Sequence, residues 1–319
     1  MSNVDPSPFH DGERAMQAEC GLAARMEETG RKVIRSFMPA QHRQFFAQLP
    51  FLLLGARDAE GQPWASLLAG PVGFVASPDD RTLDIAAGPA PGDPLAAHLR
   101  QGASVGLLGI EPHTRRRNRA NGTLTAAQPG RGLTVAVQQS FGNCPKYINA
   151  RAPRFRADLA ALSPPPAMAA AELADLSARI VAEADTLFIA SAYQAEPAVA
   201  GHGVDVSHRG GRPGFVERLD ATTLRFPDYR GNFLFNTLGN LLRQPRCGLL
   251  FLDFDTGALV HLAGRAAILR DPAILGRYPG AERAVEFHIE RVLFRPRAIP
   301  LDWHFLEPAP QFAAADASR

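Results

Sequence analysis

The sequence predicts a mainly β protein with helices (α+β), built as two small, closed or half-closed barrels in tandem. Two observations predict this class. Segments 66–83 and 207–224 align without a gap, and eight of their eighteen positions are identical, where residue frequencies of roughly 7% give about one. Short strand-like segments separated by turns also recur in both halves, interrupted by one short helix. A period this long indicates a duplicated domain rather than a solenoid.

The first half begins with helical spacing and then changes to strand spacing. Apolar residues recur at helix-like intervals among charges over residues 9–48, with Pro39 interrupting the run. From Phe51 onward the pattern predicts two hairpins, a short helix, a buried strand and two further strands. The hairpins are expected at 51–56 with 64–70 and at 73–77 with 82–87, and the helix at 94–101. The buried strand is expected at 103–110 and the two further strands at 121–127 and 133–140.

The second half repeats this order after a linker. Strands are expected at 186–192, 201–216, 223–228, 247–254 and 258–269, with a helix at 232–244. Residues 281–295 fit either a helix or a strand. The predicted organisation is a helical segment 1–50, a barrel 51–151, linker helices 152–180, a second barrel 181–307 and a disordered tail 308–319.

Composition and charge limit the classes of function. The formal net charge is +2, so no polyanion such as a nucleic acid is expected as a partner. The three cysteines form no CxxC pair, and no metal-ligand motif is present. We see no signal peptide and no stretch near the ~20 apolar residues of a membrane span. The expectation is therefore a cytoplasmic protein without a metal and without a membrane partner.

Residues suited to binding an anion gather in the second repeat. Arginine forks, glycine-exposed amides and helix N-termini all bind phosphate oxygens. The set consists of Ser207, His208 and Arg209 at the end of a predicted strand, Arg230 before a predicted helix, Asn232, Asn236 and Asn240 on one stripe of that helix, and Arg265 on a later strand. A purely structural alternative is that Asn232 caps the helix and the arginines are solvated. The number of such residues favours a phosphate site.

The first repeat keeps the pattern but lacks these residues. Ser66 matches Ser207 at the offset of the two aligned segments. Leu68, Pro89, Pro91 and, with a one-residue shift, Thr123 stand where the second repeat has Arg209, Arg230, Asn232 and Arg265. We therefore expect one anion site per chain.

The first repeat has polar features of its own. If 113–119 is a strand, Arg115, Arg117 and Arg119 share one face and could point at a bound group or an acidic substrate, or they could protect a solvated edge. Asn143 and Cys144 lie in a GNCP turn. That turn is either structural or a contact to the bound group.

The long motifs DVSHRGGRPGFV, TLRFPDYRGNFLFNTLGNLLRQ and LAGRA resemble the split-barrel, FMN-binding proteins related to pyridoxamine 5'-phosphate oxidase. The first half, with QSFGNCPKYI, is similar to the leading domain of tandem members of that group. The resemblance spans about residues 9–305 and implies two split β-barrels with FMN in the groove between them.

The resemblance also implies a function. It implies that Ser207, Arg209, Arg230, Asn232, Asn236 and Asn240 hold the phosphate of FMN, with Arg265 as a further cation. The leading expectation is an FMN-dependent oxidoreductase acting on a small molecule, with NAD(P)H or a separate reductase as electron source, in a homodimer. The tandem layout departs from the single-barrel subunit of the oxidase, so that reaction is not implied. A flavin carrier without catalysis and a haem-binding or haem-degrading protein are the alternatives.

Overall fold

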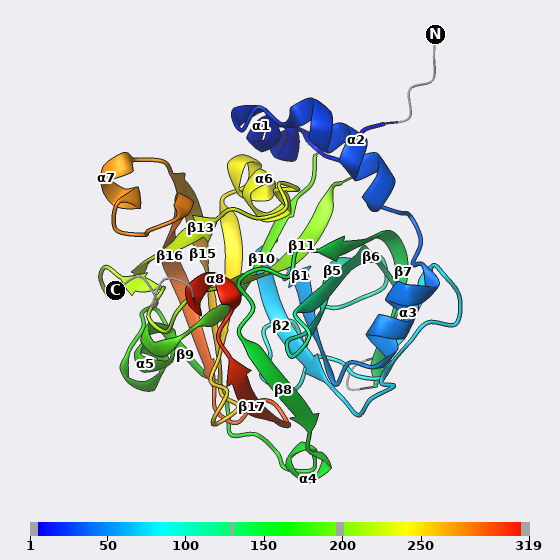
Figure 1. Cartoon of the computed structure of the whole chain (residues 1–319). Helices are drawn as coiled ribbons and strands as arrows, with labels where there is room; N and C mark the ends of the chain where they lie inside the picture. Colours follow the sequence, from blue (N-terminus) through cyan, green and yellow to red (C-terminus); the bar gives the residue numbers. More distant parts are fainter. Residues whose placement is uncertain (1–5, 129–130, 196–200, 314–319) are drawn as a thin grey trace.

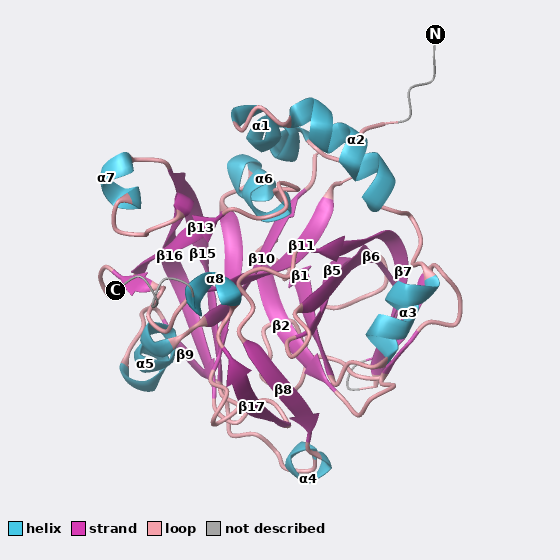
Figure 2. Ribbon diagram, viewed as in Figure 1, coloured by secondary structure: helices cyan, strands magenta, loops and turns pink. Residues whose placement is uncertain are grey.

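The computed structural model describes residues 6–128, 131–195 and 201–313, and it contains two strand-rich halves (Figures 1 and 2). The first half is a seven-stranded antiparallel sheet in the order β2-β1-β5-β6-β7-β4-β3. Its strands are β1 (Phe51–Arg57), β2 (Pro63–Ala69), β3 (Val75–Ala76), β4 (Thr82–Ile85), β5 (Ser104–Glu111), β6 (Arg116–Gln128) and β7 (Gly132–Asn143).

The second half repeats the topology of the first. Its main path runs β11-β10-β14-β15-β16-β13-β12, so each strand has a counterpart in the same place. A register bulge falls between Asn121 and Gly122 in the first half and between Ala263 and Gly264 in the second. The strands are β10 (Thr186–Tyr193), β11 (Gly203–Gly210), β12 (Glu217–Arg218), β13 (Thr223–Tyr229), β14 (Arg246–Leu252), β15 (Leu259–Leu269) and β16 (Ala281–Arg295). The predicted duplication and α+β class are confirmed, and 281–295 is a strand.

Helices α1, α2 and α6 lie together at one end of the sheets (Figure 1). The predicted N-terminal helical segment forms three helices, and α1 packs on α6 of the second half (Figure 1). Close packing is possible because both helices present glycine, with a Cβ on Gly12 lying 2.3 Å from the Gly239 carbonyl oxygen. The helices are α1 (Asp11–Glu19), α2 (Ala23–Val33), α3 (Ala40–Ala47), α4 (Ala157–Ala160), α5 (Asp175–Glu183), α6 (Asn236–Arg243), α7 (Pro272–Leu275) and α8 (Pro310–Ala313). Among the described residues, no helix is both long and apolar enough to cross a membrane.

Two predictions about local structure differ from the observed chain. Residues 94–101 form turns instead of a helix, because Pro94 and the neighbouring Pro/Gly loop favour turns. The predicted linker 152–180 contains α4 and α5, but it starts as strand β8 (Ala150–Phe155), and β9 (Met168–Ala170) adds to β16. Strand β8 pairs with β17 (Leu301–Glu307) near the other end of the chain, and Figure 1 shows these two strands side by side.

The predicted disordered tail also differs in its first part. Residues 308–313 are described and include α8, and the remainder, 314–319, lies outside the described residues. The backbone N–H of Ala309 donates a hydrogen bond to Oδ1 of Asn149 at 2.8 Å, and the Phe312 ring lies 5.7 Å from the Tyr147 ring. These contacts hold the segment against the chain that follows β7.

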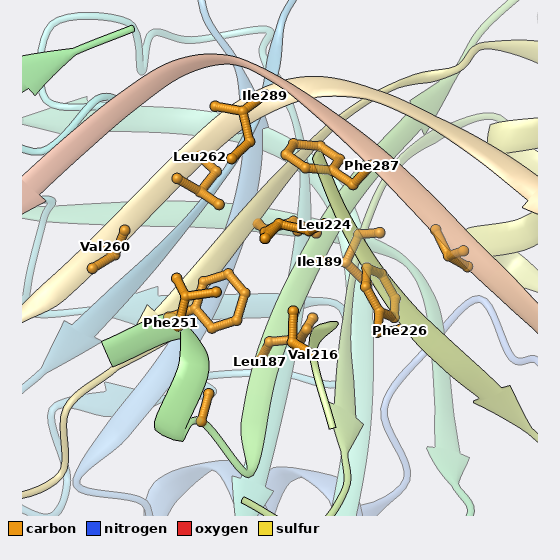
Figure 3. Packing of buried hydrophobic residues seen from close by; sticks show 14 of the residues in the cluster. Leu187, Ile189, Val216, Leu224, Phe226, Phe251, Val260, Leu262, Phe287 and Ile289 are labelled. Carbon is orange, nitrogen blue, oxygen red and sulfur yellow. The ribbon is translucent and has the colours of Figure 1, made fainter. Parts of the chain in front are cut away.

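Each half has its own core. In the second half, side chains from several strands converge, among them Leu187, Phe251 and Phe287 (Figure 3). A third apolar cluster combines the two halves, with Leu53 and Leu108 of the first packed with Phe188 and Leu250 of the second. Burial of apolar surface from both halves stabilises the contact between the two halves.

Glycines let the two sheets approach closely at this junction. An added Cβ on Gly106 would lie 2.4 Å from the Val204 carbonyl oxygen. An added Cβ on Gly248 would lie 2.4 Å from the Pro63 carbonyl oxygen, in the corresponding contact of the other half. Backbone of one half therefore lies directly on a strand of the other at two equivalent places.

We predict that Gly106→Ala destabilises the protein by about 1–3 kcal/mol, because the new methyl group must push the two sheets apart. Thermal or urea unfolding monitored by circular dichroism measures this change. Gly276→Ala is the matched control, since its Cβ would lie 3.4 Å from the nearest atom on the exposed end of α7. Equal stability of both variants would show that the junction is not tightly packed.

Candidate functional site

A polar cavity of about 110 Å³ lies where the two halves meet. The first half contributes residues of β6 and of the segment after β7, and the second contributes the end of β11 and the chain leading into α6. The predicted residues that line it are Arg117, Arg119, Asn143, Cys144, Ser207, His208, Arg209, Asn232 and Asn236. The basic strand of the first repeat and the polar set of the second therefore surround one cavity within a single chain.

A buried ion pair joins the two halves at the cavity wall. Arg119 donates hydrogen bonds to Oδ1 of Asp205 at 2.6 Å and to Oγ of Ser207 at 2.5 Å. The hydroxyl of Thr237 in α6 also donates to Ser207 Oγ, at 2.9 Å. Nδ2 of Asn240 donates to the second oxygen of Asp205 at 3.0 Å. Because Arg119 and Asp205 are both nearly fully buried, the position of each guanidinium and carboxylate atom is closely constrained.

Several donors around the cavity have no partner in the described chain. These buried atoms are Nε of Arg117, Nε of Arg119, Nε of Arg209 and Nδ2 of Asn143. An unpaired buried donor costs about 1–3 kcal/mol, and more when it is charged. All of these residues line the same cavity. The arrangement fits a ligand group that is rich in acceptor oxygens and carries negative charge.

The electrostatic environment is cationic although the groups are buried. Burial lowers the pKa of Arg117 to about 10, so this side chain stays charged at neutral pH. Arg117 also donates to the carbonyl oxygen of Cys144. Burial, and then the neighbouring guanidinium groups of Arg117 and Arg209, lower the pKa of His208 well below 6.5. His208 is therefore a neutral imidazole beside two cations.

Acidic residues hold the walls of the cavity in place. Asp228 accepts hydrogen bonds from Arg209 at 2.5 Å and from Arg283 at 3.0 Å. Glu13 of α1 accepts from Nδ2 of Asn236 at 2.5 Å. Burial, followed by the nearby charge of Asp205, raises the pKa of Glu13 well above its ordinary value.

Sequence reasoning did not identify these acids. Asp205 is an acidic residue inside an apolar strand pattern, which is a usable signal of a buried polar partner. Asp228 is the last residue of one predicted strand, and Arg209 lies near the end of another. Nothing in the sequence around Glu13 indicates that α1 packs on α6, more than 200 residues away.

Some of the predicted residues lie away from the cavity. The side chain of Arg230 is 67% exposed and lies 3.9 Å from Glu282. Arg265 is on the surface and pairs with Glu290 at 3.0 Å. Arg115 precedes β6 in a left-handed conformation with φ of 58° and pairs with Glu307 instead of sharing a face with Arg117.

The asparagine stripe is also not formed as predicted. Phe233 and Phe235 adopt left-handed backbone with φ of 60° and 59°, so α6 starts only at Asn236. Asn232 is outside the helix and its side chain accepts from the Leu234 N–H at 3.2 Å. Asn236 and Asn240 remain one turn apart, and they contact Glu13 and Asp205.

An aromatic cavity of about 610 Å³ adjoins the polar one. The two cavities share Tyr147, Pro227 and Tyr229 as lining residues. The rings of Tyr147 and Tyr229 stack with centroids 5.1 Å apart, and Phe312 of α8 lies beside both. The combined site offers cationic donors at one end and aromatic surface at the other.

We predict that His208 remains unprotonated at pH 6.5 in the ligand-free protein and gains a proton more readily when an anion binds. A bound negative charge offsets the two guanidinium groups and raises the pKa of the imidazole. Linkage then requires anion affinity to increase as the pH falls through the range where bound His208 protonates. NMR titration of the His208 ring with and without phosphate measures both pKa values, with the exposed His113 as reference signal. Titration of the free His208 at or above its ordinary pKa would contradict this electrostatic picture.

Comparison with known proteins agrees with the architecture. A sequence model of the pyridoxamine 5'-phosphate oxidase family matches residues 38–162 and again residues 173–302. No curated protein sequence matches the chain.

Solved structures similar to the chain match only part of it. One is a variant of HupZ from group A Streptococcus (12% identity, TM-score 0.30, covering 38% of this chain and 99% of that one). Another is an FAD-binding protein from Mesorhizobium loti (16% identity, TM-score 0.28, covering 41% of this chain and 97% of that one). A third is a protein from Clostridium acetobutylicum related to general stress protein 26 of B. subtilis (15% identity, TM-score 0.26, covering 41% of this chain and 92% of that one). On the two family matches, which together cover most of its length, the chain belongs to the pyridoxamine 5'-phosphate oxidase family.

Proposed function

We propose that the protein binds one FMN per chain in the cavity between its two halves and acts as an oxidoreductase on a small molecule. The observation that carries the proposal is the set of unpaired buried donors on Arg117, Arg119, Arg209 and Asn143 around one cavity. These donors come from both halves. Negatively charged oxygen atoms of a ligand would satisfy them.

The size of the two adjoining cavities supports a ligand with a small anionic end and a larger flat end. A volume of about 110 Å³ suits a phosphate-sized group, and about 610 Å³ lies within the range of sites for larger organic ligands. Tyr147 and Tyr229 at the shared wall offer π surfaces for a ring. The residues present therefore fit FMN, with Arg117, Arg119, Arg209 and Asn143 on the phosphate side.

Flavin supplies the electron-transfer chemistry when it is bound, and the protein supplies position and charge. Arg119 and Asp205 fix the cavity wall, and neutral His208 adds no further positive charge beside Arg117. The electron source is proposed to be a nicotinamide or a separate reductase. Because one chain completes the cavity, flavin binding does not require the homodimer that the resemblance implies, and the dimer stays a prediction.

The first test is the identity of the bound group. We expect freshly purified protein to show a flavin absorption spectrum and to release FMN on denaturation. Chromatography of the released chromophore identifies it. Recovery of FAD or haem as the main species would contradict FMN binding, and anaerobic titration with NADH or NADPH distinguishes an oxidoreductase from a carrier that is not reduced.

The second test is substitution of a cavity arginine. Arg209→Met should weaken FMN binding about ten- to a hundredfold, because one charge-assisted hydrogen bond contributes about 1.5–3 kcal/mol. Flavin fluorescence quenching measures the Kd. Arg230→Met is the matched control, since Arg230 lies on the neighbouring loop with an exposed side chain outside the cavity, and its Kd should change by less than about threefold. Similar Kd values for both variants and the parent protein would rule out the proposed phosphate side.

A further inference from the structure

The duplication creates a filled counterpart of the cavity, formed by Ser66, Asp93, His261 and Arg295 and called the second groove. Strand pairing identifies the equivalent positions. Ser66 pairs with Leu54 as Ser207 pairs with Ile189. Leu108 pairs with Arg119, and the matching Leu250 pairs with His261. His261 thus takes the place of Arg119.

One further position completes the comparison. Arg117 of β6 pairs with Asn143 of β7, and the matching pair in the second half is Leu259 with Arg295. Arg295 therefore stands where the cavity has Asn143. The second groove, like the first, combines a serine of one half with basic side chains of the other.

A carboxylate of the chain itself occupies this groove. Oδ1 of Asp93 accepts from the Ser66 hydroxyl at 2.5 Å and from the Leu95 backbone N–H at 3.0 Å. Oδ2 accepts from Nη1 of Arg295 at 2.8 Å, and Nε2 of His261 lies 4.0 Å away. A hydroxyl, a backbone amide and a guanidinium group converging on two oxygens is the arrangement that binds a free anion.

The groups in this groove are buried and paired. Ser66 and His261 are 0% exposed, Arg295 is 3% and Asp93 is 6%. None of their side-chain atoms is among the unpaired buried atoms of the described residues. The cavity lined by Arg117, Arg119 and Arg209 shows the opposite state, with donors left unpaired. In this groove a carboxylate accepts from the serine hydroxyl, whereas in the cavity Ser207 accepts from Arg119 and Thr237 instead.

We propose that the groove of the first repeat is an anion site whose ligand is built into the chain as the carboxylate of Asp93. The Pro/Gly loop before Asp93 carries it inward, and Arg295 also donates to the Pro91 carbonyl oxygen of that loop at 3.4 Å. Removing this carboxylate opens a site for a small carboxylate or phosphate anion, held by Ser66, Leu95 N–H and Arg295. The inference does not depend on the identity of the ligand in the other cavity.

The test is rescue of Asp93→Ala by small anions. Full-length protein is unfolded thermally in sodium chloride and in sodium formate, acetate or phosphate at equal ionic strength. The Tm of Asp93→Ala should be reduced in chloride and should rise in a saturable manner with formate or acetate, by about 2–4 °C at several times the Kd. Anion binding in the intact cavity changes the Tm of the parent protein and of Asp93→Ala equally. The difference between the Tm responses of these two proteins therefore reports on the second groove alone.

Two further variants make the test specific. Asp93→Asn keeps the volume filled and should show no response to acetate beyond that of the parent. Asp93→Ala combined with Arg295→Met should lose the response. If Asp93→Ala does not fold in chloride, refolding from urea in formate or acetate should recover folded protein. An equal anion response of Asp93→Ala and the parent, or failure to recover the variant in any of these anions, would overturn the proposal.

Discussion

The close contact between the two halves is the constraint on which the candidate site depends. Backbone of one half lies on glycines of the other at Gly106 and Gly248, and a shared apolar cluster surrounds these contacts. Only at this separation can Arg119 of β6 reach Asp205 and Ser207 of β11. The buried ion pair is thus a consequence of sheet packing. Removing one partner would leave the other charge buried and unpaired, which is strongly destabilising.

The duplicated fold supplies two equivalent grooves, and the side chains within them make the difference. In one groove, guanidinium and amide donors remain unpaired around a cavity. In the other, Asp93 accepts hydrogen bonds from Ser66 and from Arg295, which stands where the cavity has Asn143. A symmetric architecture therefore holds an asymmetric distribution of charge. This explains in physical terms why one ligand per chain is expected although the backbone offers two similar places.

Much of this was predictable from the sequence, and the exceptions have identifiable causes. The identical residues of 66–83 and 207–224 revealed the repeat, and strand alternation placed Arg117 and Arg119 together. Alternation failed at Arg115 because Arg115 itself adopts left-handed backbone, and β6 begins only at Arg116. The helix start was misplaced because Phe233 and Phe235 adopt left-handed backbone, which is uncommon for residues with a bulky side chain. Glu13 and the β8–β17 pair depend on contacts between distant segments, and local patterns carry no information about them.

The most direct test of the central claim is a crystal structure of the full chain after saturation with FMN. The account predicts a single flavin per chain, with phosphate oxygens within hydrogen-bond distance of Arg117, Arg119 or Arg209 and Asp93 still bound to Ser66 and Arg295. A flavin phosphate in the groove of the first repeat, or flavin bound outside the junction between the halves, would contradict it.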